Sequence, residues 1–209
     1  LATMSQGSEP WRLDPVTLEN LGPDPKLASV VGHDGIAGEF KIDGKTGDMV
    51  FLNYPENPPC INVGIANAAG DVVDYRRVDL PSPRWPHDLG ITENFIIIHD
   101  LPLFFDAELL AAGKRELRFH DHIPSRFGII PRANLHADVQ WFETEPSFIL
   151  HSANYYEHGD EIIMDSCLSF DPKGPGVSEH KDHNARIMAH LDKHQTKTRL
   201  HRLTFNLST

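Results

Sequence analysis

The sequence predicts an all-β fold made of short antiparallel strands. Apolar and β-branched residues occur in short runs, and turn-forming residues separate these runs about every 8–12 positions. The chain of 209 residues is 40% hydrophobic and 23% charged, which suits one domain over residues 1–209. No run approaches the roughly 20 apolar residues of a membrane span. A β-sandwich, a barrel and a propeller share this rhythm, and no clean internal repeat chooses between them.

Turn chemistry sets the strands expected in the first half of the chain. Asp14-Pro15 favours a turn, and Gly44-Lys45-Thr46-Gly47 is typical of a hairpin loop. Ala68–Asp71 separates a second pair of apolar runs in the same way. The strands expected here are Trp11–Leu13, Thr17–Leu21, Phe40–Asp43, Asp48–Tyr54, Ile61–Asn67 and Val72–Leu80.

The second half continues the pattern and adds helical segments. Thr92–Asn94 forms the expected turn before an apolar run, and Glu157–Asp160 forms another. Phe105–Gly113 is the first segment that favours a helix, and Gly113 closes it. Glu179–His194 is polar, rich in histidine and expected to be partly helical. The strands expected here are Phe95–Ile98, Arg126–Arg132, Val139–Phe142, Phe148–Asn154, Glu161–Leu168 and Thr198–Leu207.

Two histidines stand beside or within apolar strands. His87 lies at the mouth of the strand pair in Pro86–Asp106, and His151 lies inside the first strand of Phe148–Asp165. A stiff strand fixes the direction of an imidazole, which suits metal binding. The alternative is a core histidine with one hydrogen-bond partner, which is the commoner role of a lone histidine in an apolar strand. The total of 13 histidines is a weak pointer to metal.

The net charge excludes some classes of binding partner, and the cysteine content indicates the cellular compartment. The formal net charge of −11 argues against a nucleic acid or an anionic membrane surface as partner, because both require a basic surface. Cys60 and Cys167 are too few for a disulfide framework, so a reduced, cytoplasmic setting is expected. The chain begins at Leu1 and shows no signal peptide, which suggests that the sequence is part of a longer polypeptide.

Five collinear blocks carry a resemblance to a known family. The chain resembles the carotenoid cleavage oxygenases, which include carotenoid, apocarotenoid and lignostilbene dioxygenases. One block has His-Asp followed by Ile-Thr-Glu-Asn, another reads Arg-Phe-Gly-x-x-Pro-Arg, and a third has a histidine followed by an asparagine and an acidic turn. Together the blocks cover residues 1 to about 168. They are Trp11–Gly22, Lys41–Met49, Pro86–Leu101, Arg126–Arg132 and Phe148–Asp165.

This resemblance implies a fold and a chemistry. The implied fold is a seven-bladed β-propeller with four-stranded antiparallel blades and short helical insertions. The implied activity is that of a non-haem Fe(II) dioxygenase that cleaves a C=C double bond of a carotenoid, apocarotenoid or stilbene-like substrate with O2. Four histidines hold the iron in the family, and His87 and His151 match two of them. The implied partners are an apolar conjugated substrate, O2 and, for substrate uptake, a peripheral membrane contact.

The chain departs from the family pattern at the other metal positions. Alignment on Lys41-Ile42-Asp43 puts Glu39 where the family has its first histidine. Glu39 is then either a carboxylate ligand of Fe(II) or a position that has lost its metal role, and His33 upstream is a further alternative. Gln6 stands where the family has a glutamate that orients an imidazole. Nothing after Phe205 supplies the family's fourth histidine.

The length of the chain limits how much of the implied propeller it can form. A blade needs roughly 40–50 residues, so this chain makes about four blades. Either the rest of the propeller comes from the remainder of the polypeptide or from another chain, because exposed strand edges favour pairing, or the propeller is not closed. Two functional hypotheses therefore follow. One is the Fe(II) dioxygenase, and the other is a non-catalytic propeller-type binding or scaffold module with a degraded metal site.

Overall fold

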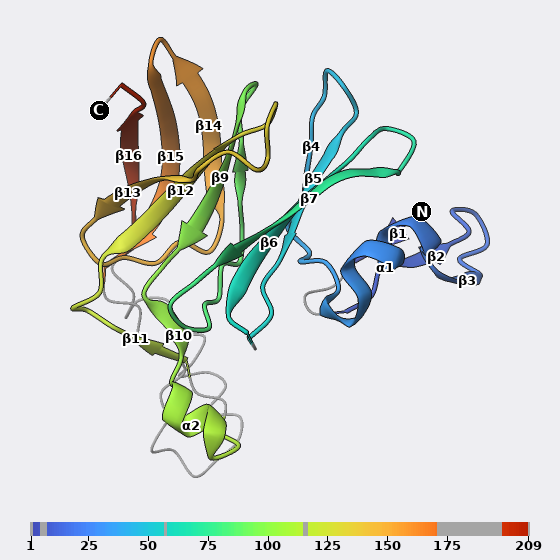
Figure 1. Ribbon diagram of the computed structural model, residues 1–209, viewed down its shortest axis with the longest axis horizontal. Helices are drawn as coiled ribbons and strands as arrows, with labels where there is room; N and C mark the ends of the chain where they lie inside the picture. The colour runs from blue at the N-terminus through green and yellow to red at the C-terminus, as the bar shows by residue number, and fades with distance from the viewer. Residues whose placement is uncertain (1, 5–7, 57, 115–116, 171–197, 209) are drawn as a thin grey trace.

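The chain folds into antiparallel β-sheets whose strands follow one another along the sequence (Figure 1). This computed structural model describes residues 2–4, 8–56, 58–114, 117–170 and 198–208. Within those ranges every strand pair is antiparallel and the helices are short, so the predicted all-β class is confirmed. The predicted helix at Glu179–His194 lies outside the described residues.

Each large sheet is a meander of neighbouring strands. The N-terminal sheet contains β1 (Ala2–Thr3), β2 (Trp11–Leu13) and β3 (Asn20–Pro23). The second sheet contains β4 (Lys41–Ile42), β5 (Met49–Asn53), β6 (Cys60–Ala66) and β7 (Val72–Asp79). The third contains β8 (Gly90–Ile91), β9 (Phe95–Asp100), β12 (Ser125–Pro131) and β13 (Gln140–Thr144). The fourth contains β14 (Ser152–His158), β15 (Glu161–Ser169) and β16 (Thr198–Asn206).

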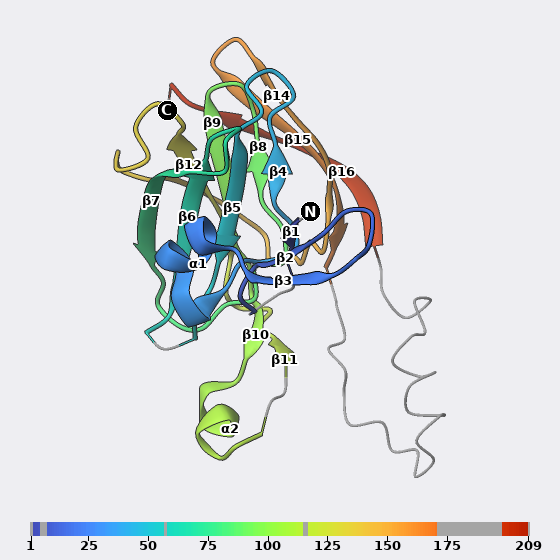
Figure 2. The same ribbon diagram turned by 90° about the vertical axis from the view of Figure 1, so that its right-hand side faces the viewer.

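Helices and a small hairpin occupy the connections. Helix α1 (Pro25–Val31) and the 3-10 turn η1 (Gly32–Asp34) link the first two sheets. Strand β10 (Leu103–Phe105), helix α2 (Ala107–Ala111) and strand β11 (Leu117–Phe119) form an insertion between β9 and β12. The insertion projects away from the large sheets (Figure 2). The predicted helix at Phe105–Gly113 is thus confirmed in its centre, and Gly113 has the expected positive φ of 74°.

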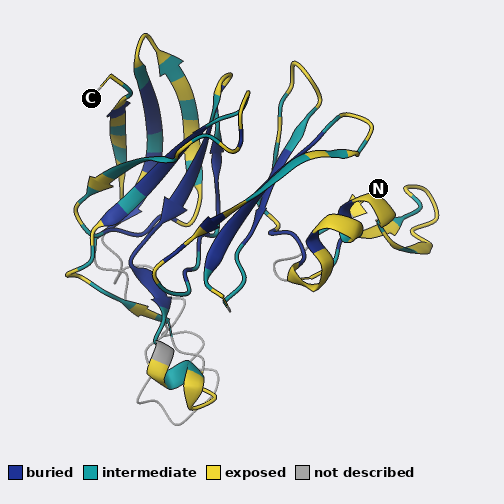
Figure 3. Ribbon diagram, in the orientation of Figure 1, coloured by how far each residue is buried: buried dark blue, intermediate teal, exposed yellow. Residues whose placement is uncertain are grey.

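The third sheet is the centre of the hydrophobic core because both of its faces are buried. Ile96 and Ile98 of β9 pack with Val63 and other residues of the second sheet. Ile97, on the opposite face of β9, packs with Ile162 and other residues of the fourth sheet. Successive side chains of a strand point to opposite faces, so a strand buried on both sides needs an unbroken apolar run. Figure 3 shows this dark blue core between sheets with exposed hairpin tips.

An ion pair joins two sheets near the hairpin tips. Arg132 Nη1 lies 2.7 Å from Asp43 Oδ2 in the β4–β5 loop, and both side chains are largely buried. The same Nη1 donates to Thr92 O at 2.9 Å, in the loop between β8 and β9. Arg132, which directly follows β12, therefore joins the second and third sheets. Arg126 instead binds Asp100, its cross-strand neighbour within the third sheet.

Several local predictions were wrong or incomplete. Helix α1 was not predicted, although Asp24 caps it through Lys26 N and Leu27 N and Pro25 occupies its first turn. His151 does not lie inside a strand. The chain pairs through a single bridge at Phe148, leaves the sheet, and rejoins it as β14 only at Ser152.

The four large sheets resemble propeller blades in their meander topology, yet the described residues form no closed propeller. Two of these sheets have four strands and two have three. No described helix is long and apolar enough to span a membrane.

Candidate metal centre

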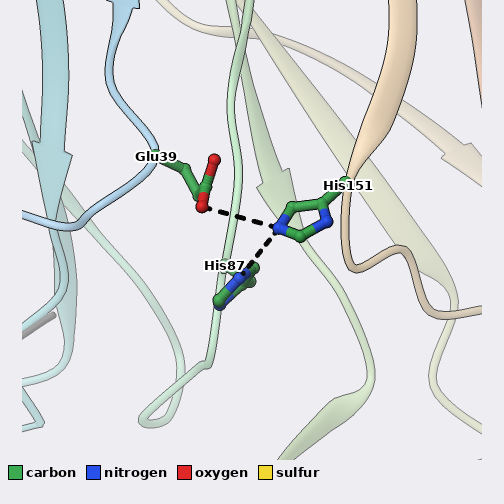
Figure 4. A group of neighbouring side chains, drawn as sticks. All are labelled: Glu39, His87 and His151. Carbon is green, nitrogen blue, oxygen red and sulfur yellow. Dashed lines mark hydrogen bonds and ion pairs between the residues drawn. The ribbon is translucent and has the colours of Figure 1, made fainter.

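Three side chains from separate parts of the chain meet at one point. Glu39 lies between η1 and β4, His87 lies in the segment that leads into β8, and His151 immediately precedes β14. Figure 4 shows their side chains pointing toward one another. Each therefore comes from the entrance of a different sheet. The predicted proximity of the two imidazoles is confirmed.

The distances suit a shared ion. The Nε2 atoms of His87 and His151 are 3.2 Å apart, and His151 Nε2 lies 3.5 Å from Glu39 Oε1. One donor atom from each of the three residues lies within 4.8 Å of the others. Two ligand atoms in adjacent positions, each about 2.1 Å from one ion, are about 3 Å apart. The distances from His151 Nε2 to the other two donor atoms are thus close to the spacing that a single ion requires.

Electrostatics keep His87 neutral. Partial burial, followed by the neighbouring His151, lowers the pKa of His87, while Glu39 acts in the opposite direction. A neutral imidazole has a lone pair available for a metal. His87 Nδ1 is buried and has no hydrogen-bond partner among the described residues, so it is suited to donate a proton to an acceptor that completes the site.

Aromatic side chains lie beside His87. The rings of Trp85 and His87 lie 5.5 Å apart, and Trp85 stacks on Phe148 with ring centroids 5.8 Å apart and an interplanar angle of 1°. Phe148 is itself three residues before His151. Trp85 therefore gives the His87 ring an apolar neighbour, and Phe148 extends this apolar surface.

A partly buried polar network lies next to His151. Tyr155 Oη is 2.6 Å from Ser152 Oγ and 2.8 Å from His99 Nε2. Burial lowers the pKa of His99 to about 4 and raises the pKa of Tyr155, so both are neutral near pH 7. Ser166 Oγ donates to His151 O at 3.2 Å. Sequence reasoning missed His99 and Tyr155 as neighbours of the site, since their contact joins two sheets.

The remaining predicted residues lie away from this group or outside the described residues. Gln6 lies outside the described residues, so its contact with an imidazole stays a prediction. His33 is not in the three-residue group, and its fully exposed ring is 3.2 Å from Glu9 Oε1 instead. For the third position the geometry therefore favours Glu39 over His33.

The donor set fits Fe(II). Two imidazoles and one carboxylate on one side of an ion form a set used by non-haem Fe(II) oxygenases, and such a set leaves other positions open. A surface cluster of acidic groups would lack the paired imidazoles and the buried Nδ1 of His87. The fold and this group together define a class: an all-β protein with a candidate mononuclear metal centre at the entrances of three successive sheets.

Comparison with known proteins identifies the family. The family model described as RPE65, retinal pigment epithelial membrane protein, matches residues 1–209. The chain belongs to this family, which is that of the carotenoid cleavage oxygenases.

Curated relatives include enzymes of two kinds. The chain is 32% identical over 218 aligned positions to a carotenoid 9,10(9',10')-cleavage dioxygenase of Crocus sativus, covering 100% of this chain and 37% of that protein. It is 28% identical over 173 positions to resveratrol cleavage oxygenase 1 of Chaetomium globosum, covering 79% of this chain and 29% of that protein. The chain therefore spans about a third of the length of these curated relatives.

Solved structures share the fold. The lignostilbene dioxygenase of Pseudomonas brassicacearum superposes with a TM-score of 0.83 at 20% identity, covering 100% of this chain and 43% of that one. A Glu150Gln mutant of the Synechocystis apocarotenoid oxygenase superposes with a TM-score of 0.81 at 17% identity, covering 99% and 44%. At such low identity the likeness supports the architecture alone.

Proposed function

We propose that this chain forms part of a non-haem Fe(II) dioxygenase that cleaves a C=C double bond of a carotenoid, apocarotenoid or stilbene-like substrate with O2. His87, His151 and Glu39 are the proposed metal ligands. The observation that carries the proposal is their convergence from three separate segments, with donor atoms within 4.8 Å of one another. The names of the relatives, which cleave carotenoids and resveratrol, support the substrate class.

The residues of the chain have distinct tasks in this proposal. Bound Fe(II) would supply the activation of O2. His87 presents a neutral imidazole, His151 presents a second imidazole, and Glu39 presents a carboxylate that offsets part of the charge of a cation. Trp85 and Phe148 line one side of the site with apolar surface, which suits a conjugated substrate.

We extend the proposal to the rest of the protein. Residues 1–209 form one domain that contributes about four blades to a seven-bladed propeller, and the remainder of the polypeptide or another chain contributes the others. The side-chain carbonyl of Gln6 would accept a hydrogen bond from the Nδ1–H of an imidazole. A cytoplasmic location and a peripheral membrane contact for substrate uptake belong to the same proposal.

One observation favours a second candidate function. Glu39 replaces the histidine of the family pattern, so the chain is alternatively a binding or scaffold module in which the metal site has degraded. In that case the three side chains would be held together only by the hydrogen bond and the ion pair between them.

Metal analysis of the purified full-length polypeptide separates the two functions. The dioxygenase requires stoichiometric iron that falls at least tenfold in the His87→Ala and His151→Ala variants. His136→Ala is the matched control, because His136 is an exposed histidine that pairs with Asp74 away from the site. Iron-free protein, with unchanged stability in the His87→Ala and His151→Ala variants, would establish the scaffold instead.

A second variant locates the lost family ligand. Glu39→His restores the histidine of the family pattern at a position where the side chain already faces His151. Under the scaffold hypothesis this variant gains iron that the natural chain does not bind. Under the dioxygenase hypothesis both proteins bind iron, whereas Glu39→Ala binds it more weakly.

A further inference from the structure

We infer that Asp88 is a positioning residue that holds together the three chain segments carrying His87, His151 and Glu39. This inference rests on the proposed metal centre. Its basis is a set of hydrogen bonds that converge on one buried carboxylate. Asp88 itself is not a ligand in the group of three donor side chains.

The carboxylate of Asp88 is 1% exposed and accepts from three donors. Lys41 Nζ lies 2.6 Å from Oδ1, and the backbone N–H of Leu89 donates to the same oxygen at 2.8 Å. The backbone N–H of Ser152 donates to Oδ2 at 2.9 Å. Both oxygens are therefore occupied, and none of the three partners is an acceptor.

Each contact reaches a segment that carries a candidate ligand. Asp88 follows His87 directly in the chain, and Ser152 follows His151 directly. Lys41 lies two residues after Glu39, at the start of β4. A single side chain thus connects the entrances of β4, β8 and β14. Moving any one of these segments would break a hydrogen bond to a group that has been removed from water.

The geometry explains why a carboxylate occupies this position. Asparagine has the same shape, but its NH2 group would face either the Lys41 ammonium or the Ser152 N–H, and both are donors. Asparagine would also leave the charge of the Lys41 ammonium, which is 30% exposed, without its partner. The Asp88→Asn change therefore releases at least one segment while it preserves side-chain volume.

Asp100 supplies the matched control. It is also a buried aspartate, 2% exposed, and it accepts from Arg84 and Arg126. Arg126 lies on β12, and Arg84 lies three residues before His87, so Asp100 reaches the segment of His87 but not the segments of Glu39 and His151. Asp100→Asn therefore reports the cost of disturbing a buried carboxylate that does not connect the three metal-bearing segments to one another.

Co(II) binding to the full-length polypeptide tests the inference, with the Co(II) d–d absorption as the readout. We expect Asp88→Asn to raise the Kd for Co(II) about 10- to 100-fold, the usual effect of removing a group that orients metal ligands. We expect Asp100→Asn to lower the midpoint of urea denaturation and to leave the Kd within about twofold. If Asp88→Asn fails to fold, Lys41→Met takes its place in the test. Lys26→Met is then the control, because Lys26 pairs with Asp71 and with none of the three metal-bearing segments.

The outcomes separate the inference from the proposed function. If the natural protein binds no Co(II), the metal centre is wrong and the inference is wrong with it. If the natural protein binds Co(II) and Asp88→Asn binds it with the same Kd, only the inference is overturned. An equal loss of affinity in Asp100→Asn also overturns it, since the effect would then be general destabilisation.

Discussion

Replacing Gly90 with alanine tests how tightly the third and fourth sheets are packed beside the site. Gly90 lies on β8, where an added Cβ would be 2.5 Å from Cε1 and Cζ of the Tyr155 ring. No real Cβ approaches ring carbons so closely, so Tyr155 must move. Tyr155 is half-buried and is held by hydrogen bonds to His99 and Ser152, which limits how far its ring can move.

The cost follows from these contacts. Overpacking a buried site costs about 1–3 kcal/mol. Displacement of Tyr155 also puts two hydrogen bonds at risk, each contributing about 1 kcal/mol. We therefore expect Gly90→Ala to lower the free energy of unfolding by about 2–4 kcal/mol. For a chain of this size that corresponds to a fall in Tm of about 5–15 °C.

Thermal and urea denaturation of matched variants measure this cost. Gly44→Ala is the control, because a Cβ at Gly44 meets nothing within 4 Å. On a Tyr155→Leu background the added methyl group has no ring to displace, so Gly90→Ala should cost at least 1 kcal/mol less there. A Gly90→Ala protein as stable as Gly44→Ala, with no coupling to Tyr155→Leu, would refute the packing argument.

Three further predictions concern buried groups. Burial lowers the pKa of His99 to about 4, so between about pH 6.5 and pH 4 this histidine is protonated in the unfolded chain but not in the folded chain. The free energy of unfolding therefore falls as the pH drops through this range. Urea titrations should show that His99→Gln removes about 3 kcal/mol of this pH-dependent loss; identical pH profiles would contradict the assignment. Arg132→Met leaves the largely buried Asp43 carboxylate without its cation and should lower the free energy of unfolding by about 3 kcal/mol. The same substitution should lower it by less on an Asp43→Asn background. Phe127→Ala removes a fully buried ring between two sheets and should cost about 3–5 kcal/mol in urea denaturation, whereas Val73→Ala at an exposed position should change stability by less than about 0.5 kcal/mol.

Local turn chemistry made most of the strands predictable. The loop of Gly44 to Gly47 forms the predicted hairpin, and Gly47 adopts a φ of 78° that suits glycine. The unbroken apolar run at Ile96–Ile98 predicted a strand, but not that both faces of its sheet are covered. That feature depends on which sheets lie on either side, and these partners are far away in the sequence.

The missed elements have identifiable causes. Helix α1 is only seven residues long, and its only clear local signal is the Asp24-Pro25 start, which also favours a turn. Strands β10 and β11 pair across the helical insertion, so neither is evident alone. His151 was placed inside a strand because Phe148 and Ile149 continue the apolar pattern, whereas the ladder begins at Ser152.

The site was predictable only in part from single positions. His87 and His151 carry weak signals alone, and the resemblance brought them together. The distance of 3.2 Å between their Nε2 atoms confirms that proximity, while their binding of a metal stays a prediction. Glu39 was ambiguous in sequence because a carboxylate on a loop is common. Its approach to His151 from another sheet is a tertiary feature that spacing does not reveal.

The positions of the three candidate ligands explain how such a site forms without a sequence repeat. Glu39 lies two residues before β4, His87 three residues before β8, and His151 one residue before β14. Each of these strands is the first of its sheet and lies at the sheet's edge. The segment that leads into an edge strand is not yet committed to a ladder, so its side chain can turn toward the neighbouring sheets.

The three candidate ligands share their place just before the first strand of a sheet, but they need not be of the same residue type. A carboxylate and two imidazoles can therefore occupy equivalent positions. The same geometry specifies where another ligand would lie if a further sheet packs beside these three. It should stand within about three residues of the first strand of that sheet, as at the three entrances described above. A metal-bound structure of the full-length polypeptide in which the additional ligand comes from the middle of a sheet would contradict this rule.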